Sequence, residues 1–274
     1  MTAEPRPRRY LMCAPEYFAV EYAINPWMDP SQPVDAELAR RQWEGLRQAL
    51  TGLGHSVDTL TPLPGLPDMV FAANGGFSVD GIVYGARFRF PQRAAEAAVH
   101  REYYEADPAM WKFVSPRQTN EGEGDFAYLP AVHGGLVLAG YGFRTEHAAH
   151  AEVQAVLGRP VLSLRLVDSR FYHLDVALAP VDDENIAYYP GAFTAGSKRV
   201  LRELFPNAVL ADEDDALAFG LNLVSDGRHV VLPAEAVGLA AKIADAGYVP
   251  VPVDLSELKK GGGSVKCCVA ELRP

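Results

Sequence analysis

Polar residues recur in this chain at intervals of about fifty residues, and this spacing constrains the fold more than any other feature. Each one stands near the start of an apolar segment expected to open a strand, turn, strand and helix unit. The markers are Asn74, Asp125, His173, Asn222 and Cys267, at intervals of 51, 48, 49 and 45 residues. Repeats of this length favour a radial or solenoid arrangement. The alternative is a plain α/β domain in which these positions coincide by chance.

The apolar pattern supplies elements for such units. Helical spacing predicts helices over residues 35–52, 92–106, 145–157, 196–205 and 234–246. Strand pairs are expected at 69–79 with 82–88, 126–129 with 136–142, 176–180 with 186–190, and 221–225 with 229–233. The Asp226-Gly227 dipeptide predicts a hairpin within the last pair.

Five units fit the chain only if one of them is divided between its two ends. The divided unit would take one strand from residues 10–14 and another from residues 265–272. Pairing of those strands would close a ring, and the five markers would then point toward one axis. Cys267, His173 and a carboxylate from residues 121–125 would become neighbours.

The net charge of the chain limits the kinds of molecule that it is expected to bind. The 274 residues carry a formal net charge of −10, which argues against a nucleic-acid partner, because phosphates select clustered Lys and Arg. A cationic small molecule suits this charge. No stretch reaches the roughly 18 consecutive apolar residues of a membrane span, so no membrane partner is expected. The sequence leaves the oligomeric state open, and a homo-oligomer is compatible with it.

The three cysteines, Cys13, Cys267 and Cys268, have neither the number of a disulfide framework nor the spacing of a zinc site. They predict a reducing, cytoplasmic compartment and no bound metal. The first residues carry basic side chains but no long apolar core, so no secretory signal is expected.

One chemical motif is a run of three glycines, residues 261–263, followed closely by Lys266 and Cys267. Glycines let the backbone pass close to a ligand, and a cysteine beside a lysine is able to act as a thiolate. Alternation along a strand would put Cys267 and Cys268 on opposite faces, one functional and one in the core. Alternatively, both are buried strand residues.

A second motif pairs His173 with Asp175, two residues apart and therefore on one face of a predicted strand. An imidazole and a carboxylate on one face suit proton transfer combined with recognition of a cation. The alternative is a core histidine with a salt-bridging aspartate.

Further polar residues cluster near predicted strand ends. Glu121, Glu123 and Asp125 lie within five residues and would repel one another without a cation; a solvated acidic turn is the alternative. Asp68 and Asn74 flank an apolar segment. Arg144 stands at a strand end, where it is able to hold a carboxylate, or it is a surface arginine.

Together, these motifs resemble the arginine-modifying enzymes of the pentein superfamily, over nearly the whole chain from Tyr10 to Leu272. The resemblance implies an α/β fold, a five-bladed pseudo-symmetric propeller of ββαβ-type repeats, in one catalytic domain over residues 1–274. Residues 12–28 look most like the catalytic domain of arginine dihydrolases.

The resemblance also implies roles for individual residues. Cys267 matches the nucleophile, His173 the general acid and base, and Glu121 the carboxylate that orients the histidine. Glu123 is the alternative for that last role, because the acidic loop is one residue longer than the common form.

The substrate-binding residues follow in the same way. Asp68, Asp125 and Asp175 match carboxylates that bind a guanidinium, and Arg144 matches the arginine that holds the substrate carboxylate. Arg87 and Asn25 are assigned to the amino-acid end.

Two positions distinguish members of the superfamily. Dimethylargininases typically carry Lys where this chain has Asp175, and deiminases carry Asp where it has Asn74. The pattern therefore favours an arginine dihydrolase, which forms a thiouronium intermediate and releases ornithine, ammonia and carbon dioxide, or citrulline after a single cycle. Dimethylarginine hydrolysis and amidinotransfer are alternatives within the superfamily, and a non-catalytic binding propeller is the alternative outside enzymes. The implied chemistry needs no metal, nucleotide or redox cofactor.

Overall fold

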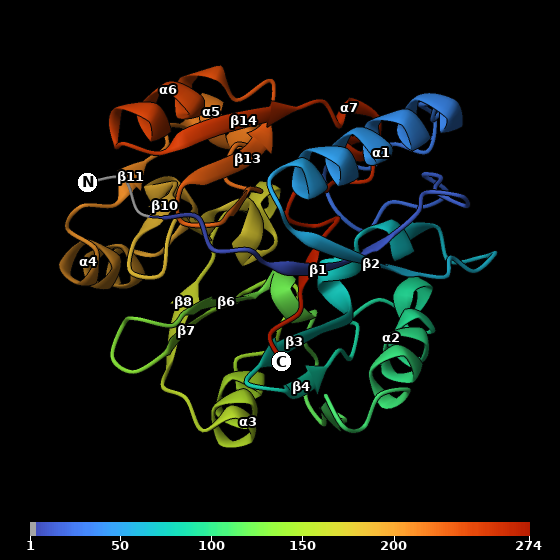
Figure 1. The fold of residues 1–274 in the computed structure, drawn as a ribbon, viewed down its shortest axis with the longest axis horizontal. Coiled ribbons are helices and arrows are strands. Elements are labelled where there is room, and N and C mark those ends of the chain that lie inside the picture. Colours follow the sequence, from blue (N-terminus) through green and yellow to red (C-terminus); the bar gives the residue numbers. More distant parts are fainter. Residues whose placement is uncertain (1–3) are drawn as a thin grey trace.

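Five small sheets surround a common centre, with helices on the outside (Figure 1). The computed structural model describes residues 4–274, so residues 1–3 of the predicted domain, and with them the start of the segment in which no secretory signal is expected, lie outside the described residues. Every sheet has three strands: the first two are antiparallel, and the third runs parallel to the middle strand. The expected five-bladed α/β propeller is confirmed, and a chance coincidence of polar residues does not explain it.

The blades follow one another along the chain. The first contains β3 (Gly76–Val79), β4 (Ile82–Gly85), α2 (Glu96–Glu105) and β5 (Lys112–Val114). The second contains β6 (Phe126–Leu129), β7 (Leu136–Tyr141), α3 (Ala148–Leu157) and β8 (Val161–Arg165). The third contains β9 (Leu178–Pro180), β10 (Ile186–Tyr188), α4 (Ala195–Leu204) and β11 (Val209–Leu210). After the short helix α5 (Glu213–Leu217), the fourth contains β12 (Val224–Ser225), β13 (His229–Pro233), α6 (Val237–Asp245) and β14 (Val249–Val253).

The fifth blade joins the two ends of the chain, as the sequence predicts. Strand β1 (Arg9–Cys13) lies between β15 (Ala270–Glu271), which is antiparallel to it, and β2 (Ser56–Leu60), which is parallel. Helix α1 (Ala36–Gly52) connects β1 to β2, and α7 (Ser256–Lys259) precedes the C-terminal strand. This pairing closes the ring of blades.

Helix α1 shows how local sequence sets an element. Asp35 caps its N-terminus, with its side chain accepting a hydrogen bond from the backbone N–H of Leu38 at 2.9 Å. The apolar face that contains Trp43, Leu46 and Leu50 is buried, as the helical spacing predicts. None of the helices in residues 4–274 is long and apolar enough to cross a bilayer.

The expectation that the marker residues stand on strands is wrong. Residues 67–70 and 72–75 form 3₁₀ turns, and the first strand begins only at Gly76. The segment is apolar and fully buried, so its pattern could not separate a strand from a buried turn. The same tight turns precede β6 and β9, at residues 122–124 and 174–176.

Two further expectations fail for the same reason. His173 and Asp175 do not alternate along a strand, since a 3₁₀ turn begins directly after His173. Cys267 and Cys268 lie in a turn rather than on opposite faces of a strand, and both are buried. A tight turn directs these side chains toward the centre of the propeller. A strand at the same place would run past the centre instead.

Candidate active site

Cys267 lies at the centre of the propeller, in the turn that follows the glycine-rich loop. Gly262 of that loop has φ +88° and packs against Asn25, so a side chain there would be strained and would collide with Asn25. The sulfur of Cys267 is 3.2 Å from Asp175 Oδ2 and 3.2 Å from Asn222 Nδ2. Burial, together with the negative charge of Asp175, raises the pKa of the Cys267 thiol. The thiol therefore donates to Asp175 in the free enzyme.

His173 is held by a buried ion-pair chain. Its Nε2 is 2.7 Å from Glu121 Oε2, and the same oxygen accepts a hydrogen bond from Arg144 Nη1 at 2.7 Å. Burial alone would raise the pKa of Glu121, but the charge of Arg144 and the hydrogen bond with His173 hold it well below its usual range. Glu121 is thus an anion that fixes one ring nitrogen of His173.

Glu123, the alternative partner for His173, makes different contacts. Its carboxylate pairs with Lys266 and Arg273 and accepts the backbone N–H of Glu271. Burial opposes ionisation, but these two cations keep the pKa of Glu123 below its usual value. Of the two glutamates, Glu121 contacts the histidine, while Glu123 fastens the acidic loop of the second blade to the fifth blade.

Three predicted site residues have buried polar atoms without a hydrogen-bond partner among residues 4–274. These atoms are Asp68 Oδ1, His173 Nδ1 and Asp175 Oδ1. Burial raises the pKa of Asp175 to about 7 and also raises that of Asp68. Two carboxylate acceptors and an imidazole nitrogen suit a planar cation with several N–H donors, and one of the carboxylates, Asp175, lies beside the Cys267 thiol.

Asp125 is placed differently from the other predicted guanidinium ligands. Its Oδ1 accepts the backbone N–H of Leu174 at 3.0 Å, and its Oδ2 accepts that of Thr145 at 3.2 Å. Burial raises its pKa to about 6. Because both oxygens bind backbone groups, Asp125 anchors the turn that carries His173.

Arg93 is a site residue that sequence reasoning missed. Its Nη1 donates to Asn74 Oδ1 at 2.7 Å, and its Nη2 donates to the Asp68 carbonyl and to Glu96. Asn74 in turn donates to the Glu121 carbonyl at 3.4 Å. The spacing of Arg93 and Glu96 is that of a helical ion pair, which gave no sign that the pair is buried. Asn222 is one of the five markers of the repeat, but the sequence predicts no function for its side chain.

The three residues predicted to bind the amino-acid end of the substrate, Arg144, Asn25 and Arg87, differ in burial and in hydrogen-bond partners. Arg144 is buried, donates to the carbonyl of Ile24 as well as to Glu121, and stacks on the ring of Tyr172. Asn25 is half-buried and donates to the Gly261 carbonyl at 3.1 Å. Arg87 is exposed; its backbone pairs with Asn120, and its side chain donates to the carbonyl of Arg117.

The irregular segment between β1 and α1 covers the site. Tyr22 donates to Asp68 Oδ2 at 2.9 Å, while Asn25 contacts the glycine-rich loop and Ile24 contacts Arg144. Cys267 is only 2% exposed and His173 only 1%. Both side chains are therefore closed off from solvent in this structure.

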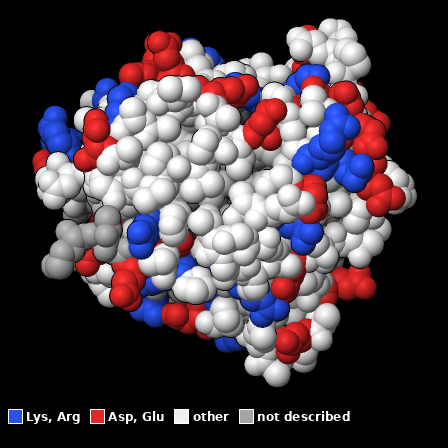
Figure 2. All heavy atoms as spheres, turned by 45° about the horizontal axis from the view of Figure 1, so that its top comes forward, with Lys and Arg blue, Asp and Glu red and all other residues white. Residues whose placement is uncertain are grey.

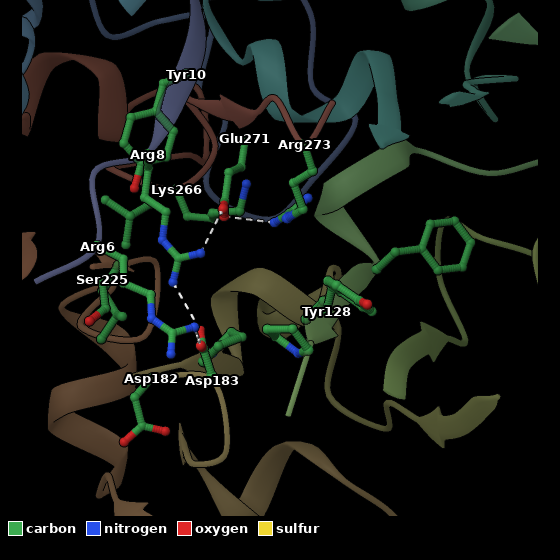
Figure 3. A pocket seen from close by; sticks show the side chains of 16 residues that line it. Arg6, Arg8, Tyr10, Tyr128, Asp182, Asp183, Ser225, Lys266, Glu271 and Arg273 are labelled. Carbon is green, nitrogen blue, oxygen red and sulfur yellow. Dashed lines mark hydrogen bonds and ion pairs between the residues drawn. The ribbon is translucent and has the colours of Figure 1, made fainter. Parts of the chain in front are cut away.

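A separate cavity of about 280 Å³ is lined by Lys266 but not by the residues predicted for the site (Figure 3). Its charged groups pair with one another: Arg8 binds Asp183 and Glu271, and Arg273 binds Glu271.

On the face drawn in Figure 2, basic and acidic side chains are interspersed. Within residues 4–274, no group of three or more His, Cys, Asp or Glu side chains is arranged to hold a metal ion.

Comparisons with known proteins point to one chemistry. The chain is 55% identical over 270 residues to the N(G),N(G)-dimethylarginine dimethylaminohydrolase of Mycobacterium tuberculosis, a match that covers 98% of this chain and 87% of that protein. It is 35% identical over 262 residues to ArgZ, the bifunctional arginine dihydrolase/ornithine cyclodeaminase of Synechocystis. That match covers 94% of this chain but only 37% of ArgZ, so the chain spans little more than a third of the bifunctional relative. No family model matches the chain.

A solved structure of an arginine dihydrolase domain has the same fold as this chain. The N-terminal domain of ArgZ, in a variant covalently bound to a reaction intermediate, superimposes with a TM-score of 0.92 at 33% identity. The alignment covers 97% of this chain and 98% of that domain.

The role of Glu123 as a fastener predicts an effect on stability. Replacing Glu123 with Gln leaves Lys266 without its ion-pair partner and leaves Arg273 with Glu271 alone, and it should lower the free energy of unfolding by about 2–4 kcal/mol at pH 7. The matched change Glu37→Gln, in an exposed helical ion pair, should cost less than about 0.5 kcal/mol.

The difference between wild type and Glu123→Gln should also depend on pH. The folded-state pKa of Glu123 is lowered, so its contribution is present above the ordinary carboxyl pKa of about 4.3 and is lost as the pH falls below it. Urea unfolding at pH 7 and pH 4 measures this. A Glu123→Gln protein as stable as wild type at pH 7 would contradict the assignment.

Proposed function

Since the chain belongs to the pentein superfamily and hydrolyses guanidino C–N bonds, we propose that its substrate is arginine and its nucleophile Cys267. One observation carries the proposal. The Cys267 sulfur is 3.2 Å from a buried carboxylate, Asp175, whose other oxygen has no partner within residues 4–274. A guanidinium bound by that oxygen would hold its central carbon close to the sulfur.

Substrate binding prepares the nucleophile. In the free enzyme, burial and the adjacent carboxylate keep Cys267 protonated. The positive charge of a bound guanidinium favours both anions, Asp175 and the thiolate, so the thiol loses its proton as the substrate arrives. His173 takes up that proton at Nδ1, which has no hydrogen-bond partner within residues 4–274, and becomes the imidazolium. The same carboxylates, Asp68 and Asp175, fix the planar cation and orient its N–H groups.

His173 handles the remaining protons. The thiolate adds to the guanidinium carbon, giving a tetrahedral adduct. The imidazolium of His173, stabilised by Glu121 at 2.7 Å, protonates one nitrogen, and the C–N bond breaks to release ammonia. Neutral His173 then takes a proton from water, which attacks the thiouronium carbon. Collapse of that adduct breaks the C–S bond and leaves citrulline.

A second cycle would convert citrulline to ornithine. Thiolate attack on the ureido carbon expels a second ammonia, and hydrolysis of the resulting thiocarbamate gives ornithine and carbon dioxide. Asn74 lies beside this reaction, with its amide bound to Arg93 and to the Glu121 carbonyl. A neutral amide there lets the ureido group turn for a second attack, where a carboxylate would hold it.

Substrate choice rests on Asp175. Its free oxygen needs an N–H donor, and an unmethylated guanidinium nitrogen supplies one, whereas a dimethylated nitrogen has none. The arginine dihydrolase relatives support this choice. Dimethylarginine is the second candidate, because the relative with 55% identity is named for that substrate. The single catalytic domain proposed over residues 1–274 would perform only the arginine-directed chemistry of the bifunctional relatives.

Product analysis tests the proposal. With arginine as the only substrate, we expect ornithine and two ammonia per arginine, or citrulline and one ammonia if the reaction stops after the first cycle. The Cys267→Ser protein should lose a factor on the order of 10⁴ or more in kcat, whereas Cys13→Ala, a buried cysteine of β1, should remain active. Dimethylamine released from dimethylarginine, with arginine inert, would contradict the proposed substrate and favour the second candidate.

The raised pKa of Asp175 predicts a dependence on pH. Asp175 is protonated below about 7 in the free enzyme and then no longer attracts a cation, so kcat/KM for arginine should fall as the pH drops through about 7. Profiles from about pH 5 to pH 9 for wild type and Asp175→Asn measure this. The variant should be much less active and should lack this acid limb; an unchanged limb would assign it to another group.

A further inference from the structure

Asn222 is the one marker of the five-fold pattern that the proposed mechanism leaves without a task. It follows the turn after α5 and directly precedes the fourth blade, and its side chain is fully buried. The other four markers are accounted for: Asn74 near the substrate, Asp125 as an anchor, His173 as acid and base, and Cys267 as nucleophile. The burial of a polar amide at the remaining marker position, Asn222, needs a physical explanation.

The Asn222 side-chain amide makes four hydrogen bonds within residues 4–274, all with Asp175, Ser264 or Cys267. Its Oδ1 accepts from the backbone N–H of Ser264 at 3.0 Å and from that of Cys267 at 3.1 Å. Its Nδ2 donates to the carbonyl of Asp175 at 3.1 Å and to the Cys267 sulfur at 3.2 Å. The amide therefore joins the turn that carries Asp175 to the turn that carries Cys267.

These partners leave the amide only one orientation. The two backbone N–H groups are donors, so they must face the oxygen of Asn222, and the Asp175 carbonyl only accepts, so it must face the NH₂ group. The remaining N–H therefore points at the sulfur of Cys267. Rotating the amide by 180° would set donor against donor and acceptor against acceptor.

We propose that Asn222 is a catalytic residue that stabilises the thiolate of Cys267 through this N–H···S hydrogen bond. The inference rests on the proposed role of Cys267 as nucleophile. The other titratable groups that interact with the sulfur are Asp175, Cys268 and Tyr172. All three are neutral or negative, so none of them favours a thiolate, and Asn222 is the donor that the described chain directs at the sulfur.

Asn222 also acts after the thiolate has formed. The sulfur carries negative charge when the C–S bond breaks in each hydrolysis, and a fixed donor stabilises a leaving group whose charge is developing. Because the same amide holds the Cys267 backbone through its oxygen, the donor keeps its distance from the sulfur while the substrate changes. An aspartate would retain the two backbone contacts but, when ionised, would have no donor for the sulfur.

The variant Asn222→Asp separates the two tasks. Its carboxylate is able to accept the Ser264 and Cys267 backbone N–H groups, so the turn is retained while the donor is lost. We expect the pH midpoint of Cys267 alkylation by iodoacetamide to rise by at least about one unit. We also expect kcat with arginine to fall about 10²–10³-fold, while KM changes by less than about threefold.

Two variants of the same chain serve as controls for these measurements. Asn185→Asp makes the same substitution in the turn between β9 and β10, where the side chain donates to the carbonyl of Asn207 and contacts no residue of the site, and it should behave like wild type. Cys267→Ser supplies the alkylation background from the two remaining cysteines. Circular dichroism and the melting temperature report whether each protein is folded.

The outcomes are distinct. An Asn222→Asp protein with a wild-type alkylation profile and kcat would overturn the inference, leaving Asn222 as an anchor only. If that variant does not fold, Asn222→Ala decides through the same alkylation profile, since an unshifted midpoint would again overturn it. Full activity of Cys267→Ser would instead overturn the proposed function, and this result is independent of the Asn222 variants.

Discussion

One buried carboxylate at the centre of this propeller, Asp175, lacks the matching cation that Glu121 and Glu96 have, and the account of the site depends on this difference. Glu121 is matched by Arg144, and Glu96 by Arg93. Within residues 4–274, Asp175 forms no ion pair of this kind: burial raises its pKa to about 7, and its Oδ2 lies 3.2 Å from the Cys267 thiol. A charge left uncompensated in a buried site is costly. In the proposed mechanism a bound guanidinium removes that cost, so the unmatched charge of Asp175 would favour a cationic substrate.

The ring of blades makes this arrangement possible. Each axial side chain lies in or beside a tight turn at the start of its blade, so residues about fifty positions apart meet at the centre. The Asn222 amide illustrates the result, because it links a turn of the third blade to one of the fifth. Closure by β1 and β15 brings the glycine-rich loop near the C-terminus into the same centre as the second and third blades.

The sequence predicted the architecture better than the details of the site. Recurrent polar residues and strand pairs were enough to predict five blades and the divided fifth blade. The local conformation at residues 67–75 was not predictable, because a fully buried apolar segment has no exposed face to set a period. The roles of Arg93 and Asn222 were missed for another reason. Their partners lie in other elements of the chain, and no local spacing reveals such contacts.

The central claim is that Cys267 becomes covalently attached to the carbon of arginine's guanidinium. Intact-mass and peptide mass spectrometry of the enzyme, mixed with arginine and quenched in acid during turnover, measure this directly. The account predicts an adduct with the mass of arginine less ammonia on the peptide that contains Cys267. Turnover without any adduct, or an adduct carried by Cys13 or Cys268, would contradict it.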